Sequence, residues 1–265
     1  MTKKAKKNKA VKAEKTAKVV DSKKLEKIKK QVAKKEIKKA AKANRPKGLA
    51  KISVPKYSLG EELVNSISHG FGAALAICGL VLLILKADRA SEIVSVSLYG
   101  AFMILLYVMS CLYHALSPKV KGKKVLRVID HANVFLMEAG TFMPICLGLI
   151  RGTQYEAWGW FCFGIVWAIT IVAVVFSSIN VDKYQGVGVA SNLILGWGSM
   201  LMLPIFVNLI PAAGIMLLVM GGVAYSLGAI LYGLGSKMKW MHSVFHFYVL
   251  LGSIFHFFFI YLFCL

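Results

Sequence analysis

The hydrophobic positions of this chain are gathered into long runs, and polar positions form short connections between them. In the hydrocarbon layer of a membrane every backbone N–H and C=O must bond within the chain, so apolar runs of about 20 residues predict spanning helices. Seven runs have that character: 66–86, 93–116, 128–150, 158–178, 189–208, 212–235 and 241–263. The pattern predicts an all-α membrane protein, a seven-transmembrane helix bundle, and excludes a soluble single domain.

A predicted break separates the fifth run from the sixth. It depends on Asn208 and Pro211, residues that favour a turn. Without this break, one run would be far too long for a single crossing.

Charge divides the chain into two parts. The 265 residues carry a net charge of +21, yet residues 1–56 hold 22 of the 33 basic and 4 of the 12 acidic residues. We therefore expect a Lys-rich tail at 1–56 and a transmembrane domain at 57–265. A Lys/Ala-rich segment with almost no aromatic residues cannot bury enough apolar surface to fold alone, so the tail is expected to be disordered.

Two alternatives exist for the tail. Leu25, Ile28, Val32 and Ile37 would form a thin apolar stripe if a helix lay along a membrane surface, and the lysines would then contact anionic lipid of the inner leaflet. Nucleic acid is not an expected partner, because a Lys run without interleaved arginines or aromatic residues offers no base recognition or stacking.

Basic residues in the short connections predict the orientation, because cytoplasmic loops carry the excess of Lys and Arg. With the N-terminus in the cytoplasm, the inner connections hold eight basic residues: Lys119, Lys121, Lys123, Lys124, Arg127, Lys183, Lys237 and Lys239. The outer connections hold three: Lys86, Arg89 and Arg151. We therefore expect a cytoplasmic N-terminus, a C-terminus outside and a location in the cell (plasma) membrane.

Ionisable residues within membrane spans are costly and indicate function. Here they gather at the predicted cytoplasmic ends of three runs. The second run ends with Ser110 and His114, one turn apart on one face. The third begins near Asp130, and the seventh begins with His242 and His246, again four residues apart. The orientation was derived from loop charge alone, so this convergence is an independent observation.

Three imidazoles from two helices, with a carboxylate nearby, suit Zn²⁺. Catalytic zinc takes three protein ligands and leaves a fourth position to water. For any one of these histidines alone, a hydrogen bond at headgroup depth is the favoured interpretation. For the set of His114, His242 and His246, a zinc site is favoured, because unrelated headgroup histidines would be spread over both leaflets.

Four further polar side chains lie close to this region in the sequence. His69 shares a helix face with Asn65 and Glu62, and we favour a helix-entry network over a role around the metal. Glu138 lies in mid-span and needs a partner or a water-filled cavity, which the sequence does not identify.

Two other histidines are expected to lie away from the ion. His131 is about 100° around the helix from Asp130 and is expected to point elsewhere. His256 follows His242 by 14 residues, about 21 Å along a helix, which places it near the other leaflet.

The arrangement resembles the hemolysin III family, the bacterial branch of the progestin and adipoQ receptor superfamily. The resemblance rests on four stretches in order: 61–70, 110–114, 130–131 followed by 139–144, and the pair His242 and His246 followed by 252–253 and His256. It implies a seven-helix bundle in which His114, His242 and His246 bind zinc, Asp130 contacts the zinc-bound water and Ser110 lines the site. Glu138 departs from the apolar residue expected there.

Two functions are compatible with these residues. The first is a zinc-dependent hydrolase of a lipid amide or ester, similar to alkaline ceramidases, in which Asp130 accepts a proton and Ser110 donates to the developing oxyanion. The second is a non-enzymatic membrane protein, either a pore-former of the cytolytic kind that gives the family its name or a receptor-like protein with structural zinc. Against a conventional channel, the spans contain no ring of like-charged residues. We favour the hydrolase.

Overall fold

The computed structural model of the chain describes residues 24, 26–27, 29–38 and 48–265. Leu25 and Ile28 of the predicted stripe lie outside the described residues. Residues 29–38 are helical, and Val32 and Ile37 in this helix are exposed.

Within residues 48–265 the structure is helical throughout, and seven stretches are long and apolar enough to cross a membrane. The elements are η1 (Gly48–Lys51), α2 (Leu59–Lys86), α3 (Ala90–Ala115), α4 (Gly122–Pro144), η2 (Ile145–Leu149), α5 (Glu156–Ile179), α6 (Gln185–Gly198), η3 (Ser199–Met202), α7 (Leu203–Leu209), α8 (Ala212–Leu234) and α9 (Met241–Phe263). Helix α4 continues through the π-turn η2 as one span, and α6, η3 and α7 together form another. The predicted seven-helix class is confirmed.

The break between the fifth and sixth spans falls where the sequence indicated it. Helix α7 ends at Leu209, and Ile210 leaves the helix with an extended backbone. Pro211 caps α8, whose first residue is Ala212.

Five spans begin earlier than hydropathy predicts, and the difference is largest for two, which begin at residue 59 in place of 66 and at residue 122 in place of 128. The start of α2 is fixed by a capping box: Ser58 Oγ accepts from the Glu61 backbone N–H, and the Glu61 side chain accepts the Ser58 N–H at 2.8 Å. At the start of α4, Lys123 and Arg127 are buried. A hydropathy criterion misses such polar first turns, although they are helical and partly buried.

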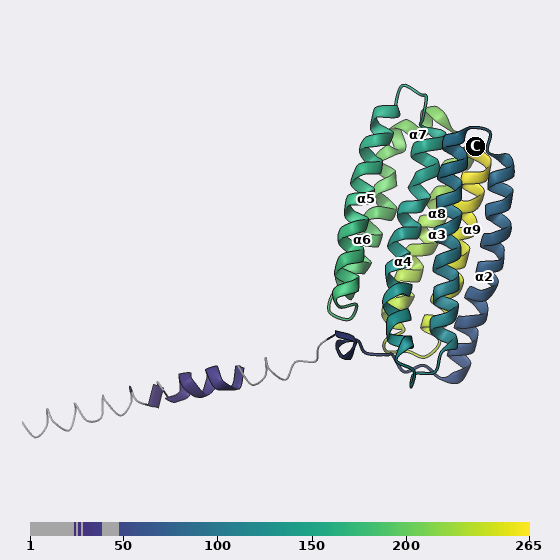
Figure 1. Cartoon of the computed structure of the whole chain (residues 1–265). Coiled ribbons are helices and arrows are strands. Elements are labelled where there is room, and N and C mark those ends of the chain that lie inside the picture. The colour runs from purple at the N-terminus through teal and green to yellow at the C-terminus, as the bar shows by residue number, and fades with distance from the viewer. Residues whose placement is uncertain (1–23, 25, 28, 39–47) are drawn as a thin grey trace, which may run out of the picture. The chain divides into compact units, whose positions relative to one another are not determined.

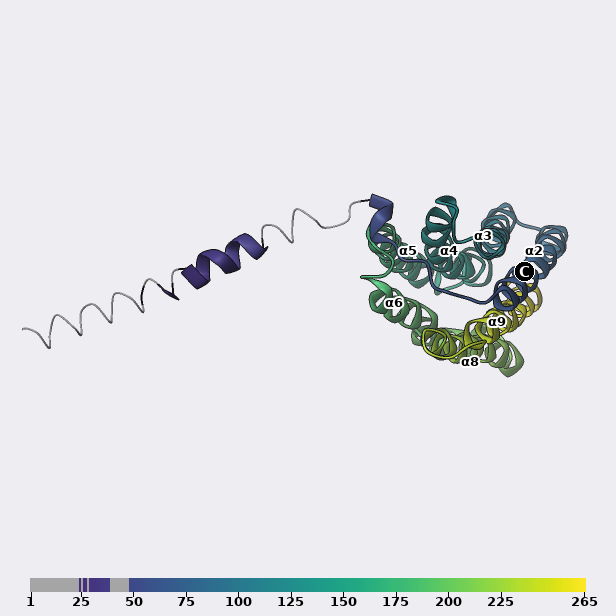
Figure 2. The ribbon, with the colours of Figure 1, turned by 90° about the horizontal axis from the view of Figure 1, so that it is seen from below.

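The helices stand side by side as a bundle (Figure 1). Each is packed against its neighbour in the chain, α2 packs against α9, and α6 packs against both α5 and α8, so the bundle closes on itself (Figure 2). The connections between α3 and α4, α5 and α6, and α8 and α9 lie at the end where the chain enters α2. We call this the entry end.

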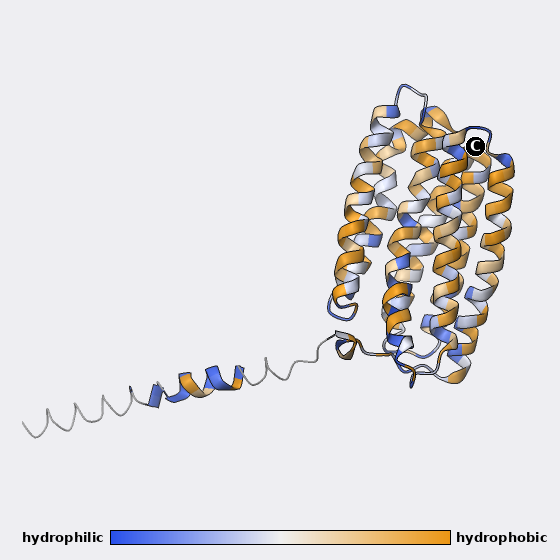
Figure 3. Cartoon of the chain, viewed as in Figure 1, coloured by the Kyte–Doolittle hydropathy of each residue, from blue (hydrophilic) through white to orange (hydrophobic). Residues whose placement is uncertain are grey.

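Hydrophilic residues collect at the entry end and in the connections, while the helix surfaces are mostly hydrophobic (Figure 3). Exposed apolar side chains cover the outside of the spans, as expected where lipid surrounds the protein. Helix α6 is the extreme case: Leu195 is its one buried residue.

Candidate metal centre

Three histidines meet at the entry end of the bundle. His114 lies in the last turn of α3, and His242 and His246 lie in the first turns of α9. All three are buried, and one ring nitrogen from each lies within 4.8 Å of the others. The sequence predicted this convergence from three positions in two separate helices.

The nitrogens are suited to a cation of zinc's size. A tetrahedral ion with Zn–N bonds of 2.0–2.1 Å holds its nitrogens about 3.3 Å apart. The Nε2 atoms of His242 and His246 are 3.3 Å apart, and Nε2 of His114 is buried without a hydrogen-bond partner in the described part of the chain. An unpartnered buried imidazole nitrogen aimed at two others is a donor set that zinc fits.

Glu62 orients His114. Its Oε2 lies 2.7 Å from Nδ1 of His114, so the proton belongs on Nδ1 and the lone pair on Nε2 faces the other two histidines. The Asn65 amide is 3.4 Å from the same Nδ1. A carboxylate behind a histidine in this way is the usual support of a metal ligand.

Glu62 is in turn held by Lys123, whose buried Nζ lies 2.5 Å from Glu62 Oε1 and donates to the Leu116 carbonyl at 2.8 Å. A buried carboxylate needs such a partner. No signal in the sequence indicates this pair, because Lys123 has the character of a loop charge and its partner is 61 residues away.

These contacts correct the expectation of a helix-entry network at the start of α2. Glu62 and Asn65 face His114, and the ring of His69 stacks on His246 with centroids 3.7 Å apart. Neither ring nitrogen of His69 has a hydrogen-bond partner among the described residues. All three side chains belong to the surroundings of the histidine cluster, because α2 packs against both α3 and α9 at this level.

Asp130 and Ser110 line the cavity beside the cluster, together with His69, His242 and His246. Ser110 is buried on α3. Asp130 on α4 does not belong to the group of mutually close ligand atoms that the described residues form. It therefore lines the cavity beside the cluster without being one of these ligand atoms.

His131 lies outside the three-histidine group that the described residues form, as expected, yet its side chain does not turn away from Asp130. His131 Nδ1 lies 3.6 Å from Asp130 Oδ2, its Nε2 lies 3.1 Å from the Tyr232 hydroxyl, and it lines the same cavity. Helix α4 packs against α3, α5 and α6, so its inward face is broad enough to hold two successive residues.

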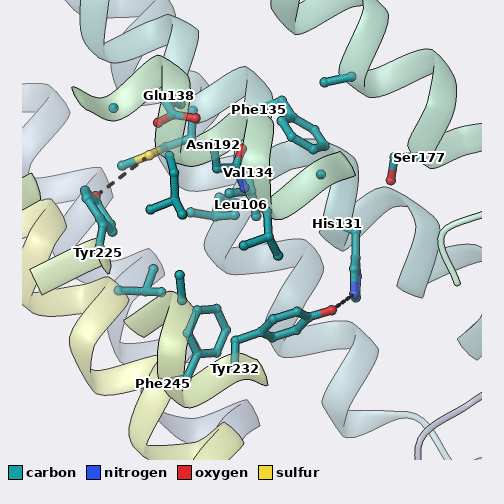
Figure 4. A pocket seen from close by; sticks show the side chains of 18 of the residues that line it. Leu106, His131, Val134, Phe135, Glu138, Ser177, Asn192, Tyr225, Tyr232 and Phe245 are labelled. Atoms are coloured by element: carbon teal, nitrogen blue, oxygen red, sulfur yellow. Dashed lines mark hydrogen bonds between the residues drawn. The ribbon is translucent and has the colours of Figure 1, made fainter. Parts of the chain in front are cut away.

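The cavity continues from the cluster into the bundle between α4, α6, α8 and α9, with a volume of about 200 Å³ (Figure 4). Its walls are mostly apolar and include Leu106, Val134 and Phe135. Glu138 and His256 also reach it. His256 Nε2 lies 3.3 Å from the Leu218 carbonyl oxygen, and His256 is not in the three-histidine group that the described residues form.

A short segment ahead of α2, residues 51–58, crosses the entry end and is here called the strap. Its Tyr57 ring stacks on His242, with centroids 4.8 Å apart and planes 19° apart. Burial raises the pKa of the Tyr57 phenol, and the nearby Tyr232 raises it further. Most of this segment falls within the predicted tail, and nothing in its sequence predicts the contact with the site.

Asp182 holds the strap. The carboxylate accepts the Ser53 backbone N–H at 2.8 Å and the Arg127 guanidinium at 2.6 Å, and Arg127 also donates to the Ser53 carbonyl at 2.9 Å. Burial raises the pKa of Asp182, but the hydrogen bonds from Ser53 and Arg127 outweigh it, so the pKa lies below the usual value.

Together, the fold and the cluster define a multi-pass, seven-helix membrane protein with a buried group of three histidines at one end. A family model described as "Haemolysin-III related" matches residues 57–257. The chain belongs to the hemolysin III family.

Relatives of this chain include two from bacilli. The hemolysin-3 homolog of Bacillus subtilis (strain 168) is 35% identical over 212 residues, covering 78% of this chain and 96% of that protein. Hemolysin-3 of Bacillus cereus is 36% identical over 203 residues, covering 75% and 89%. A more distant similarity, 22% over 205 residues, joins the chain to the human monocyte to macrophage differentiation factor, with 75% of this chain and 82% of that protein covered. That protein belongs to the progestin and adipoQ receptor group.

Proposed function

We propose that this protein is a zinc-dependent hydrolase of a lipid amide or ester, with its reaction centre inside the membrane. The observation that carries the proposal is the buried nitrogen group of His114, His242 and His246, which opens onto a mostly apolar cavity. Zinc held by these nitrogens would supply an electrophile for a carbonyl and lower the pKa of a water toward about 7.

The protein's own groups would then manage the proton and the developing charge. Asp130, beside the cluster, would accept the proton of the attacking water and return it to the leaving group. Ser110, buried on the cavity wall, would donate a hydrogen bond to the oxyanion. The apolar cavity would hold the acyl chain and keep bulk water away from the carbonyl.

The test is metal content and turnover in purified protein. Wild-type protein should hold about one zinc per chain and cleave a short-chain fluorescent ceramide, and His246→Ala should lose both. His256→Ala, which removes a buried histidine of the same helix outside the cluster, is the matched control and should retain the metal. Turnover by zinc-free protein would falsify the hydrolase mechanism.

A pore-forming protein is the second candidate, and the printed name of the Bacillus cereus relative, Hemolysin-3, is the observation that favours it. A receptor-like protein in which the same histidines hold structural zinc belongs to this non-enzymatic class. Release of dye from liposomes that contain the purified protein separates the candidates. Leakage that persists in His114→Ala supports a pore, while ceramide cleavage without leakage supports the enzyme.

We further propose that the chain lies in the plasma membrane with its N-terminus in the cytoplasm and its C-terminus outside. The support is the distribution of basic residues over the connections. Membrane lipid would be the substrate, and the lysines of the tail would contact anionic lipid of the inner leaflet. Protease added to right-side-out vesicles should leave the Lys-rich tail intact, and the same protease should remove it from inverted vesicles.

A further inference from the structure

The cavity holds polar atoms, deep in the bundle, that the proposed chemistry does not use. Away from the histidine cluster, three side chains on its wall each have a buried polar atom with no hydrogen-bond partner in the part of the chain that the structure describes: Glu138 (Oε2), Asn192 (Oδ1) and His256 (Nδ1). Leaving a buried polar atom unpaired is costly, so these atoms indicate a partner supplied from outside the chain.

Other polar groups on the same wall are paired within the protein, which makes the unpaired atoms distinctive. The Tyr225 hydroxyl lies 2.9 Å from Ser253 Oγ, and the Tyr232 hydroxyl lies 3.1 Å from His131. The Trp197 indole donates to Ser226 at 2.9 Å.

Glu138 and Asn192 lie on the facing walls of α4 and α6. Asn192 and Gly196 are one turn apart on one face of α6. A Cβ placed on Gly196 would be 3.0 Å from Glu138 Oε1, so the carboxyl group lies directly against this face and occupies the room that the glycine leaves. Figure 4 shows Glu138 and Asn192 at the end of the cavity away from the bond between His131 and Tyr232.

The distance from the histidine cluster to Glu138 and Asn192 follows from the rise of helix α4. Glu138 follows Asp130 by eight residues, a rise of about 12 Å along α4. An extended chain of single bonds advances about 1.2 Å per bond, so the pair lies about ten bonds from a carbonyl held at the histidine cluster. Leu106, Val134 and Phe135 line the cavity and offer only apolar contact to the intervening chain.

We propose that Glu138 and Asn192 form a subsite for a hydroxyl group carried in mid-chain by the acyl group of the ligand. The inference rests on the proposed function, because the histidine cluster fixes where the carbonyl end lies. A hydroxyl both donates and accepts, so it can give its hydrogen to Glu138 Oε2 or Asn192 Oδ1 and accept from the Asn192 amide. A metal ion fits this pair less well, since hard cations take six or more oxygen ligands and the pair supplies few.

Binding of free fatty acids to purified protein in nanodiscs tests the subsite without requiring turnover. The probes are stearate, 10-hydroxystearate and 2-hydroxystearate, each displacing a fluorescent fatty acid. One well-formed hydrogen bond predicts that wild-type protein binds 10-hydroxystearate roughly tenfold more tightly than stearate. The 2-hydroxy isomer, whose hydroxyl lies beside the carboxylate, should show no such preference.

Two substitutions remove the subsite independently. Glu138→Leu and Asn192→Leu should each bring the ratio of the two affinities close to one while stearate binding stays within about twofold. Asn208→Leu, at an exposed position of α7, is the matched control and should keep the preference. The use of two variants on different helices protects the test against failure of one to fold.

Other outcomes overturn the subsite. They are equal affinity for stearate and 10-hydroxystearate in wild-type protein, equal preference for the 2-hydroxy isomer, absence of fatty-acid binding, or a preference that survives both substitutions. Zinc content separates the two proposals, because His114→Ala should lose zinc and turnover, whereas Glu138→Leu and Asn192→Leu should lose the preference and keep zinc. If the preference is found and no substrate is cleaved, the hydrolase falls and the subsite stands.

Discussion

Glu62 Oε2 and His114 Nδ1 are 2.7 Å apart, and this contact joins the first turn of α2 to the last turn of α3. It fixes which nitrogen of His114 faces the other two histidines. Lys123 contacts the second oxygen of Glu62. Lys123, Glu62 and His114 therefore form a continuous series of buried contacts from α4 to the cluster.

Removal of this carboxylate should weaken zinc binding without abolishing it. For Glu62→Gln we expect a loss of about 10–100-fold in zinc affinity, measured by competition with a chelator, because supporting groups of metal ligands have effects of that size. Glu156→Gln, which changes an acidic residue in the first turn of α5, is the control. Unchanged affinity in Glu62→Gln would show that the Glu62 carboxylate does not support the metal site.

Asp130→Asn should separate metal binding from chemistry. Because the carboxylate is not in the ligand group that the described residues form, zinc content should remain near the wild-type value. Turnover should fall by about 10²–10⁴-fold, the usual contribution of a positioned general base. Loss of zinc in this variant would instead make Asp130 a ligand, contrary to the arrangement described above.

The contact between the strap and Asp182 should depend on pH. The pKa of Asp182 in the folded protein is lowered from 3.8, so its contribution to stability is complete above about pH 4 and is lost as the pH falls through the folded-state pKa. Thermal unfolding of wild-type protein and Asp182→Asn should therefore differ most near neutral pH, and the difference should shrink under acid. A difference that grows on acidification would contradict the assignment of the ion pair with Arg127.

Close packing of α2 against α3 predicts a glycine that does not tolerate a methyl group. A Cβ on Gly100 would lie 2.5 Å from Leu80 Cδ1 and 2.9 Å from Leu80 Cβ. Gly100→Ala should destabilise the bundle by about 1–3 kcal/mol, the usual range for overpacking. Gly164→Ala meets no atom within 4 Å and should leave the midpoint of thermal unfolding unchanged or slightly higher.

The sequence predicted the architecture and the three histidines because both depend on local spacing. Run length and turn residues define the spans, and His242 and His246 share a helix face whatever surrounds them. The depth of His114 follows from the end of its span.

What the sequence did not predict depends on contacts between distant segments. The pairing of Glu62 with Lys123 and the stacking of Tyr57 on His242 leave no periodic signal. The contact between His131 and Asp130 was missed for a different reason: helix spacing assumes a narrow inward face, whereas α4 has neighbours on several sides.

The strap has a practical consequence for anyone who shortens this chain for expression or crystallisation. Hydropathy alone would suggest trimming to residue 66, where the first predicted apolar run begins, which deletes Ser53, Tyr57 and Glu62 and so removes the cover of His242 and the support of His114. A truncation at residue 51 discards most of the excess positive charge and leaves the complete histidine site in the product.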